Sequence, residues 1–258
     1  MKRLIFSLAL LLALHGTAQA QDAAATKVMD CARANIPKSL TIREFELTAV
    51  DRVGGSRTLK GRIYAIREDN LLRAMIKMTA PADMARSSFL VREGKDRDDM
   101  WIYLPALDRV RRITGAGTGG PLFGTDISYS DVKQMENAFS GGIVHSEKDS
   151  TLQGRPMYVL RLTPTRGEDS RYSQVRGWID QKTCVPLQVD FYEGSEVRKR
   201  LSGNAADLKQ DHAHWYLTKS RMSDLKDGTH TDLDITGVTS DNGLSSRYFS
   251  SQTFSTAD

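Results

Sequence analysis

Apolar and polar residues alternate along most of the chain, and this period of two predicts antiparallel strands joined by tight turns. In the first such stretch, Phe45 and Leu47 alternate with Glu44 and Glu46. The same alternation predicts further strands at residues 59–66, 71–78, 89–92, 100–104, 109–113, 157–163, 175–180, 187–192, 197–201, 215–222 and 233–238. Turn-forming residues separate the strands and no linker divides them. We therefore expect one mainly β domain, built as a sandwich, a barrel or a strongly curved sheet.

Two segments break the alternation and predict helices. Residues 22–36 contain three alanines near their start and end before Pro37, which is typical of a short amphipathic helix. A second short helix should run through Val132 and Met135, with Asp126 or Ser128 as its N-terminal cap.

A glycine-rich stretch, Gly115–Pro121 (GAGTGGP), precedes the second helix and is followed by an apolar pair of residues. A flexible loop that carries an apolar tip resembles a gate. Its candidate residues are Gly117, Phe123, Gly124, Thr125 and Asp126. An ordinary surface loop at the rim of the sheet is the alternative.

The first 20 residues have the layout of a secretory signal peptide. Lys2 and Arg3 precede an uncharged run from Leu4 to Leu14, and Ala18-Gln19-Ala20 offers a cleavage site. This run is shorter than the roughly 20 apolar residues that a membrane-spanning helix needs. We expect removal of residues 1–20 and a single mature domain over residues 21–258.

Charge and composition exclude several classes of protein. Lys and Arg number 36 against 32 Asp and Glu, an excess too small for a nucleic-acid-binding surface. The 40% hydrophobic and 26% charged residues describe a folding chain rather than a disordered one.

The two cysteines, Cys31 and Cys184, both lie beyond the expected cleavage site. In an oxidising compartment they could form one long-range disulfide. Two unpaired, buried cysteines that pack as small hydrophobic residues are the alternative.

Searches for catalytic and metal-binding motifs give no consistent site. The S-x-x-K, K-T-x and S-D-N elements occur in the wrong order for a serine acyl-enzyme, and the glycine loop lacks the Lys-Ser or Lys-Thr of a phosphate loop. His212 and His214 have ligand spacing but no third ligand nearby in the sequence. We expect neither an enzyme nor a metal or other cofactor. A hydrolase assembled from scattered carboxylates is the alternative, which spacing along strands does not test.

Large apolar residues on alternating positions suggest a different use of the β domain. A curved sheet has a concave face, and if helices cover it incompletely a cavity for an apolar ligand results. The candidate lining residues are Phe45, Leu47, Ile63, Met75, Phe89, Trp101, Tyr103, Leu160, Trp178, Val189 and Phe191.

Two segments carry a resemblance to a known family. The first, Arg86–Val132, contains DDMWIYLPAL, RVRRI and FGTDISYSDV, and the second is RGWIDQKTCVPLQVDFYEGSEVRKRL at residues 176–201. Both resemble the outer membrane lipoprotein-sorting proteins, which are similar in turn to the periplasmic lipoprotein carrier LolA.

The resemblance implies an incomplete antiparallel β-barrel, a half-pipe of LolA/LolB type whose concave side is covered by helices and accepts acyl chains. It implies a location in the periplasm of a Gram-negative cell envelope. The implied function is a carrier of lipids or lipoproteins that works with an inner-membrane transporter of the RND or MMPL type, with an outer-membrane acceptor as a further partner. A lipid-sensing regulator of the RseB type is the alternative. Arg109, Arg111 and Arg112 are candidate docking residues for an acidic partner or lipid phosphates, or else a solvated strand face.

Overall fold

The computed structural model describes residues 16–69, 71–94, 97–136, 139, 142–164, 170–241 and 246–257. Residues 1–15 of the expected signal peptide lie outside these ranges, whereas its last residues form the start of helix α1 (Gly16–Arg33). No helix among the described residues is long and apolar enough to cross a membrane.

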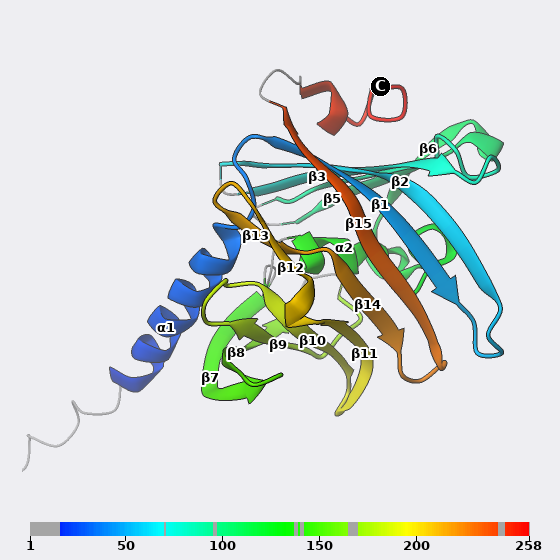
Figure 1. Ribbon diagram of the computed structural model, residues 1–258. Coiled ribbons are helices and arrows are strands. Elements are labelled where there is room, and N and C mark those ends of the chain that lie inside the picture. Colours follow the sequence, from blue (N-terminus) through cyan, green and yellow to red (C-terminus); the bar gives the residue numbers. More distant parts are fainter. Residues whose placement is uncertain are drawn as a thin grey trace, which may run out of the picture.

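Within the described ranges, a 13-stranded antiparallel sheet dominates the molecule (Figure 1). Its strands are β1 (Leu40–Val50), β2 (Ser56–Glu68), β3 (Leu71–Ala80), β4 (Ser88–Arg92), β5 (Asp99–Leu104), β6 (Arg109–Ile113), β7 (Gly142–Leu152), β8 (Arg155–Pro164), β9 (Gln174–Asp180), β10 (Pro186–Glu193), β11 (Glu196–Gly203), β14 (Lys219–Asp224) and β15 (Thr229–Asp241). The spatial order is β6-β5-β4-β3-β2-β1-β15-β14-β11-β10-β9-β8-β7. The expected mainly β fold is confirmed, and the sheet is not closed into a barrel.

The strand order consists of two meanders that meet where β1 pairs with β15. The first runs from β1 outward to β6, and the second from β7 inward to β15. Because β6 and β7 are opposite edges of the sheet, the chain between them has to cross the open side. The described residues of that crossing form three short helices: η2 (Gly115–Gly119), η3 (Leu122–Gly124) and α2 (Tyr129–Glu136). Figure 1 shows α2 inside the curve of the sheet.

Bulges contribute to the curvature of the sheet, because an extra residue bends its strand and increases the local twist. The register shifts between Glu44 and Phe45 in the β1–β15 ladder, and between Lys60 and Gly61 in the β2–β3 ladder. Phe45 lies directly opposite Gly61. A Cβ at that glycine would come within 2.7 Å of the Phe45 ring, so the glycine makes room for the ring on the inner face.

Two apolar clusters lie on opposite faces of the sheet. We call the face that α2 covers the inner face; it holds the main core, to which both meanders, α1 and α2 contribute. The outer face holds a smaller cluster, built by Leu40, Tyr64, Met75 and Leu90 with the C-terminal residues Tyr248, Phe254 and Ala257. The rings of Tyr64 and Tyr248 stack there with centroids 4.6 Å apart.

The sequence-based elements agree with the structure except at three places. β7 was not predicted, because this edge strand is mostly polar and largely unburied and so lacks clear alternation. The single strand predicted at 215–222 is two strands, β13 (His214–Leu217) and β14, which belong to different sheets. β13 instead forms a separate hairpin with β12 (Leu208–Asp211), which was not predicted either.

Candidate functional site

The segment from Thr114 to Glu136 covers the inner face of the sheet, and we call it the lid. Four of its apolar side chains, Leu122, Phe123, Ile127 and Val132, are buried in the main core. Phe123 has a positive φ of 51° and Gly124 follows with 74°. A left-handed conformation is unfavourable for a phenylalanine, so the surrounding contacts hold the backbone at this point.

The start of α2 forms a reciprocal capping pair. The Asp131 carboxylate accepts a hydrogen bond from the Ser128 amide at 2.8 Å, and the Ser128 hydroxyl oxygen accepts one from the Asp131 amide at 3.2 Å. This satisfies two amides that a helix N-terminus otherwise leaves unpaired. Ser128, and not Asp126, is therefore the N-terminal cap of α2.

Asp131 also connects the lid to the second meander. Its carboxylate is fully buried, lies 3.0 Å from Lys199 Nζ on β11, and accepts a hydrogen bond from the Tyr172 hydroxyl at 2.9 Å. Burial first, and then the Asp131 charge, raise the pKa of Tyr172 above its ordinary value, so the hydroxyl stays protonated and donates.

Lys133 connects α2 to the first meander. Its ammonium lies 2.6 Å from the Asp98 carboxylate and 3.8 Å from that of Glu93, and all three side chains are largely buried. Glu93 in turn accepts a hydrogen bond from the Leu72 amide at 2.9 Å. Buried ion pairs of Asp131 and Lys133 therefore fix α2 to opposite halves of the sheet.

The predicted gate residues Phe123, Thr125 and Asp126 lie in the part of the lid that is bonded to the sheet. Arg57 donates to the Phe123 carbonyl at 2.6 Å. The Asp126 carboxylate accepts hydrogen bonds from the Thr229 and Thr231 hydroxyls on β15. Thr125 is buried, whereas Gly117 and Gly124 are exposed. The structure thus holds this segment in a closed position, and its opening stays a prediction.

Among the described residues, α2 helps to line two cavities on the inner face. The larger, of about 140 Å³, is lined from α1, α2, β1, β10, β11, β13, β14 and β15 by residues that include Asn35, Arg43, Gln134, Val189 and Trp215. The smaller, of about 40 Å³, is lined only by apolar residues: Phe45, Leu47, Ile63, Ile76, Leu122, Ile127, Val132, Met135 and Leu233. Met135 and Leu233 line both cavities and therefore lie between them.

Seven of the predicted lining residues belong to the inner core. Phe45, Leu47 and Ile63 line the smaller cavity and Val189 lines the larger one, whereas Phe89, Leu160 and Phe191 are fully buried packing residues. Most other residues that line the two cavities, among them Arg43, Trp215 and Leu233, were not predicted from the sequence. Arg43 lies on the same face of β1 as the apolar Phe45 and Leu47, and the alternation of the sequence could have indicated this.

Four of the predicted lining residues require correction, because they lie on the outer face. Met75, Trp101 and Tyr103 pack with the C-terminal segment there. Trp178 alternates with Gly177 and Ile179, which face inward, and the Arg176 guanidinium lies over its ring at 5.0 Å. Alternation along a strand pairs residues by face but does not say which face is concave.

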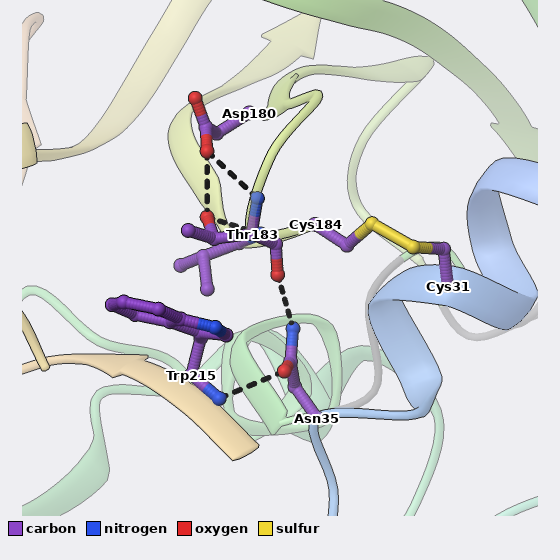
Figure 2. Close-up of a disulfide and its surroundings, with 7 residues drawn as sticks. Cys31, Asn35, Asp180, Thr183, Cys184 and Trp215 are labelled. Atoms are coloured by element: carbon purple, nitrogen blue, oxygen red, sulfur yellow. Dashed lines mark hydrogen bonds between the residues drawn. A yellow bond between two sulfur atoms is a disulfide. The ribbon is translucent and has the colours of Figure 1, made fainter. Parts of the chain in front are cut away.

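A disulfide between Cys31 and Cys184 connects the end of α1 to the turn between β9 and β10 (Figure 2). Cys31 is exposed and Cys184 is buried. Asn35, one turn further along, donates to the Thr183 carbonyl and accepts from the Trp215 amide, both at 2.8 Å. The disulfide and this asparagine together hold one wall of the larger cavity.

Asp180 supports the same turn, as Figure 2 shows. Its buried carboxylate accepts two hydrogen bonds from Arg155 at 2.7 and 2.8 Å, and two more from the amide and hydroxyl of Thr183. Burial by itself would raise the pKa of Asp180, but these hydrogen bonds outweigh it and lower the pKa below its ordinary value.

This lowered pKa predicts a dependence of stability on pH. The ionised carboxylate contributes stability above the ordinary pKa of about 4, and the contribution is lost as the pH falls through the lower pKa of the folded state. We expect Asp180→Asn to lower the free energy of unfolding at pH 7 by about 2 kcal/mol. The difference from the wild type should shrink between pH 4 and pH 2 in urea titrations. A difference that stays constant with pH would contradict this assignment.

The candidate docking residues lie on β6, an edge of the sheet. Arg109, Arg111 and Arg112 are all exposed. Arg112 forms an ion pair with Asp99 and lies over the Trp101 ring at 6.0 Å. Within the described part of the chain, no group of three His, Cys, Asp or Glu side chains could hold a metal ion.

Comparison with solved structures identifies the fold. A putative outer membrane lipoprotein-sorting protein domain from Vibrio parahaemolyticus matches with a TM-score of 0.82 and 23% identity, over 91% of this chain and 99% of that one. A DUF1329 family protein from Desulfovibrio piger matches with a TM-score of 0.81 and 23% identity, over 89% and 97%. A LolA superfamily protein from Nitrosomonas europaea matches with a TM-score of 0.68 and 19% identity, over 88% and 97%.

The sequence comparisons are less informative about function. No curated protein matches the chain. One family model, described only as that of an uncharacterized protein, matches residues 71–256, which is well over half of the chain. The protein therefore belongs to this family of uncharacterized proteins, and its fold is that of the LolA-like lipoprotein-sorting proteins.

Proposed function

We propose that this protein is a periplasmic carrier that holds the acyl chains of a lipid or lipoprotein between its lid and the inner face of its sheet. The observation that carries the proposal is the apolar inner face with two adjoining cavities under a single crossing segment. The signal-peptide pattern of residues 1–20 supports a periplasmic location, and the LolA-like fold supports a carrier. Neither a catalytic nor a cofactor role is part of the proposal.

The two cavities that α2 lines are too small for an acyl chain, so α2 and the rest of the lid have to move when cargo binds there. Sites for ligands of drug size usually have volumes of about 300–1,000 Å³, whereas the larger cavity here has about 140 Å³. An acyl chain that leaves water gains about 0.8 kcal/mol for each buried CH₂. A chain of ten such groups therefore gains roughly 8 kcal/mol, which would offset the loss of several lid contacts.

Uptake of a fluorescent fatty acid tests the proposal. We expect the delipidated protein to bind 11-(dansylamino)undecanoic acid, with a rise in dansyl fluorescence. Met135→Trp should weaken binding about tenfold or more, because the larger side chain fills the junction of the two cavities and an overpacked interior costs about 1–3 kcal/mol. Leu225→Trp, at an exposed turn, is the matched control.

Two results would argue against a carrier. The first is a folded, delipidated protein that takes up no dansyl fatty acid. The second is stable capture of a membrane protein without any lipid transfer, which would instead favour the lipid-sensing regulator.

We further propose that the arginines of β6 bring the carrier to the membrane that holds its RND- or MMPL-type transporter. Each basic residue near an anionic bilayer contributes about 1 kcal/mol. Arg109→Glu/Arg111→Glu should therefore reduce binding to phosphatidylglycerol vesicles at low salt at least tenfold in a sedimentation assay. Arg52→Glu/Lys226→Glu makes the same charge change at exposed turns away from β6. Equal losses in both variants would indicate a general charge effect and overturn the docking role.

A further inference from the structure

The walls of the larger cavity are attached to the molecule in different ways. Besides the main sheet and its β9–β10 turn, the end of α1, α2 and β13 line this cavity. The disulfide holds α1, and buried ion pairs hold α2. Among the described residues, β13 takes part in no ion pair or disulfide, and two hydrogen bonds join it to the residues that follow α1. The wall that β13 forms is therefore the most weakly attached of the three.

The β12–β13 hairpin is an excursion from the main sheet. β11 ends at Gly203, β14 begins at Lys219, and these two strands pair with each other, so residues 204–218 leave the sheet and return to it. Every residue from 204 to 217 is at least partly exposed. A segment with few buried contacts opens locally at a low cost in free energy. We therefore expect the hairpin to open more readily than α2, whose Val132 is buried in the main core.

Trp215 lies where the hairpin meets the residues that follow α1. It is half-buried and lines the larger cavity together with Asn35. Its amide donates to the Asn35 side chain at 2.8 Å, as Figure 2 shows. The neighbouring His214 Nδ1 lies 2.9 Å from the carbonyl oxygen of Ala34. These two hydrogen bonds close the wall of the cavity between α1 and the hairpin.

We propose that the β12–β13 hairpin is the entrance to the larger cavity, and that Trp215 contacts the acyl chain that enters there. The inference rests on the proposed carrier function and adds the route of entry and a residue that contacts the ligand. The lid still has to move before a whole chain fits, but it is bonded to both halves of the sheet, whereas the hairpin is not. The indole ring of a tryptophan offers a large apolar surface to an acyl chain.

Quenching by a brominated ligand tests the contact with Trp215. Bromine atoms quench tryptophan fluorescence when they touch the ring, so 9,10-dibromostearic acid reports which tryptophan lies against the bound chain. We expect this acid to quench part of the emission of the wild-type protein. Trp215→Phe should abolish the quenching, whereas Trp101→Phe, the matched control on the outer face, should keep it.

The rate of ligand uptake tests the entrance. Asn35→Ala removes the side chain that joins β13 to α1, so the hairpin should be open more often. Association of 11-(dansylamino)undecanoic acid should then be about tenfold faster in a stopped-flow experiment. Gln181→Ala removes a side-chain hydrogen bond to Asp149, outside both α1 and the hairpin, and should keep the wild-type rate. An unchanged rate in Asn35→Ala, or an equal acceleration in both variants, would overturn the entrance.

The outcomes distinguish the two proposals. If 9,10-dibromostearic acid displaces the dansyl ligand but quenches the wild-type protein and Trp215→Phe to the same extent, the role of the hairpin is overturned and the carrier function stands. If neither ligand binds to the folded protein, the carrier function fails, and the entrance fails with it.

Hydrogen exchange of the wild-type protein gives a second measurement, in case Asn35→Ala does not fold. Without ligand, the amides of β12 and β13 should exchange faster than those of α2, and bound dodecanoic acid should slow them. Exchange in the hairpin that is as slow as in α2, or that the ligand leaves unchanged, would contradict the proposal.

Discussion

Replacing Lys199 by methionine should lower the free energy of unfolding by about 3–5 kcal/mol. Lys199 Nζ lies 3.0 Å from the carboxylate of Asp131, which is fully buried on α2. The substitution leaves that carboxylate with its hydrogen bonds from Tyr172 and Ser128 but without its counter-charge. Urea unfolding followed by tryptophan fluorescence measures the loss, and hydrogen exchange of the α2 amides shows whether the lid opens more often.

An exposed ion pair provides the matched control. Lys60 and Glu46 lie 2.8 Å apart with side chains 58% and 37% exposed, so Lys60→Met should cost at most about 1 kcal/mol. Asp131→Asn/Lys199→Met should be less destabilised than Lys199→Met alone, because no buried charge then remains. If Lys199→Met lost no more stability than Lys60→Met, the ion pair would not hold the lid closed.

Removal of the disulfide should have an effect of similar size. The Cys31–Cys184 bond joins residues 153 apart in the sequence, and opening a loop of this length costs about 4–5 kcal/mol in the chain-entropy description. We expect Cys31→Ser/Cys184→Ser to unfold at a markedly lower urea concentration than the oxidised protein. Faster hydrogen exchange throughout α1 should accompany the change, since the bond connects this helix to the sheet.

The reductant dithiothreitol supplies the control for this experiment. It should shift the unfolding midpoint of the wild-type protein toward that of the double variant, and leave the double variant unchanged. If the reduced wild-type protein unfolds at the same urea concentration as the oxidised one, the disulfide makes no contribution to stability.

Most of the fold could be predicted from the sequence, because one side of most strands is buried and this enforces alternation. Where burial is weak, as on the edge strand β7, the pattern disappears and the strand was missed. The mispredicted strand at 215–222 has a different cause. Its two halves pair with different partners, β12 and β11, and such a change of sheet has no local signal in alternating residues.

The candidate site was less predictable, because its geometry depends on contacts between distant residues. The alternation of residues correctly placed Trp101 and Tyr103 on the same face of β5. That face is the outer one, where both side chains pack in the cluster that contains the C-terminal segment. The SYSDVK sequence suggested a helix cap and a misleading S-x-x-K motif. Its Asp131 and Lys133 instead form ion pairs with β11 on one side and with Asp98 on the other. The partners in each pair are far apart in the sequence, so local sequence patterns do not predict either ion pair.

The central ladder between β1 and β15 has a consequence for how the chain folds. Leu40 on β1 pairs with Asp241 on β15. The first strand of the sheet therefore cannot pair with the last one until the whole chain has been synthesised. Each meander can form its own hairpins early, but loop-closure entropy delays the ladder that joins them. We therefore expect two half-sheets to form first and then to join slowly, leaving time for a partly folded chain to expose the apolar face that later receives the lid.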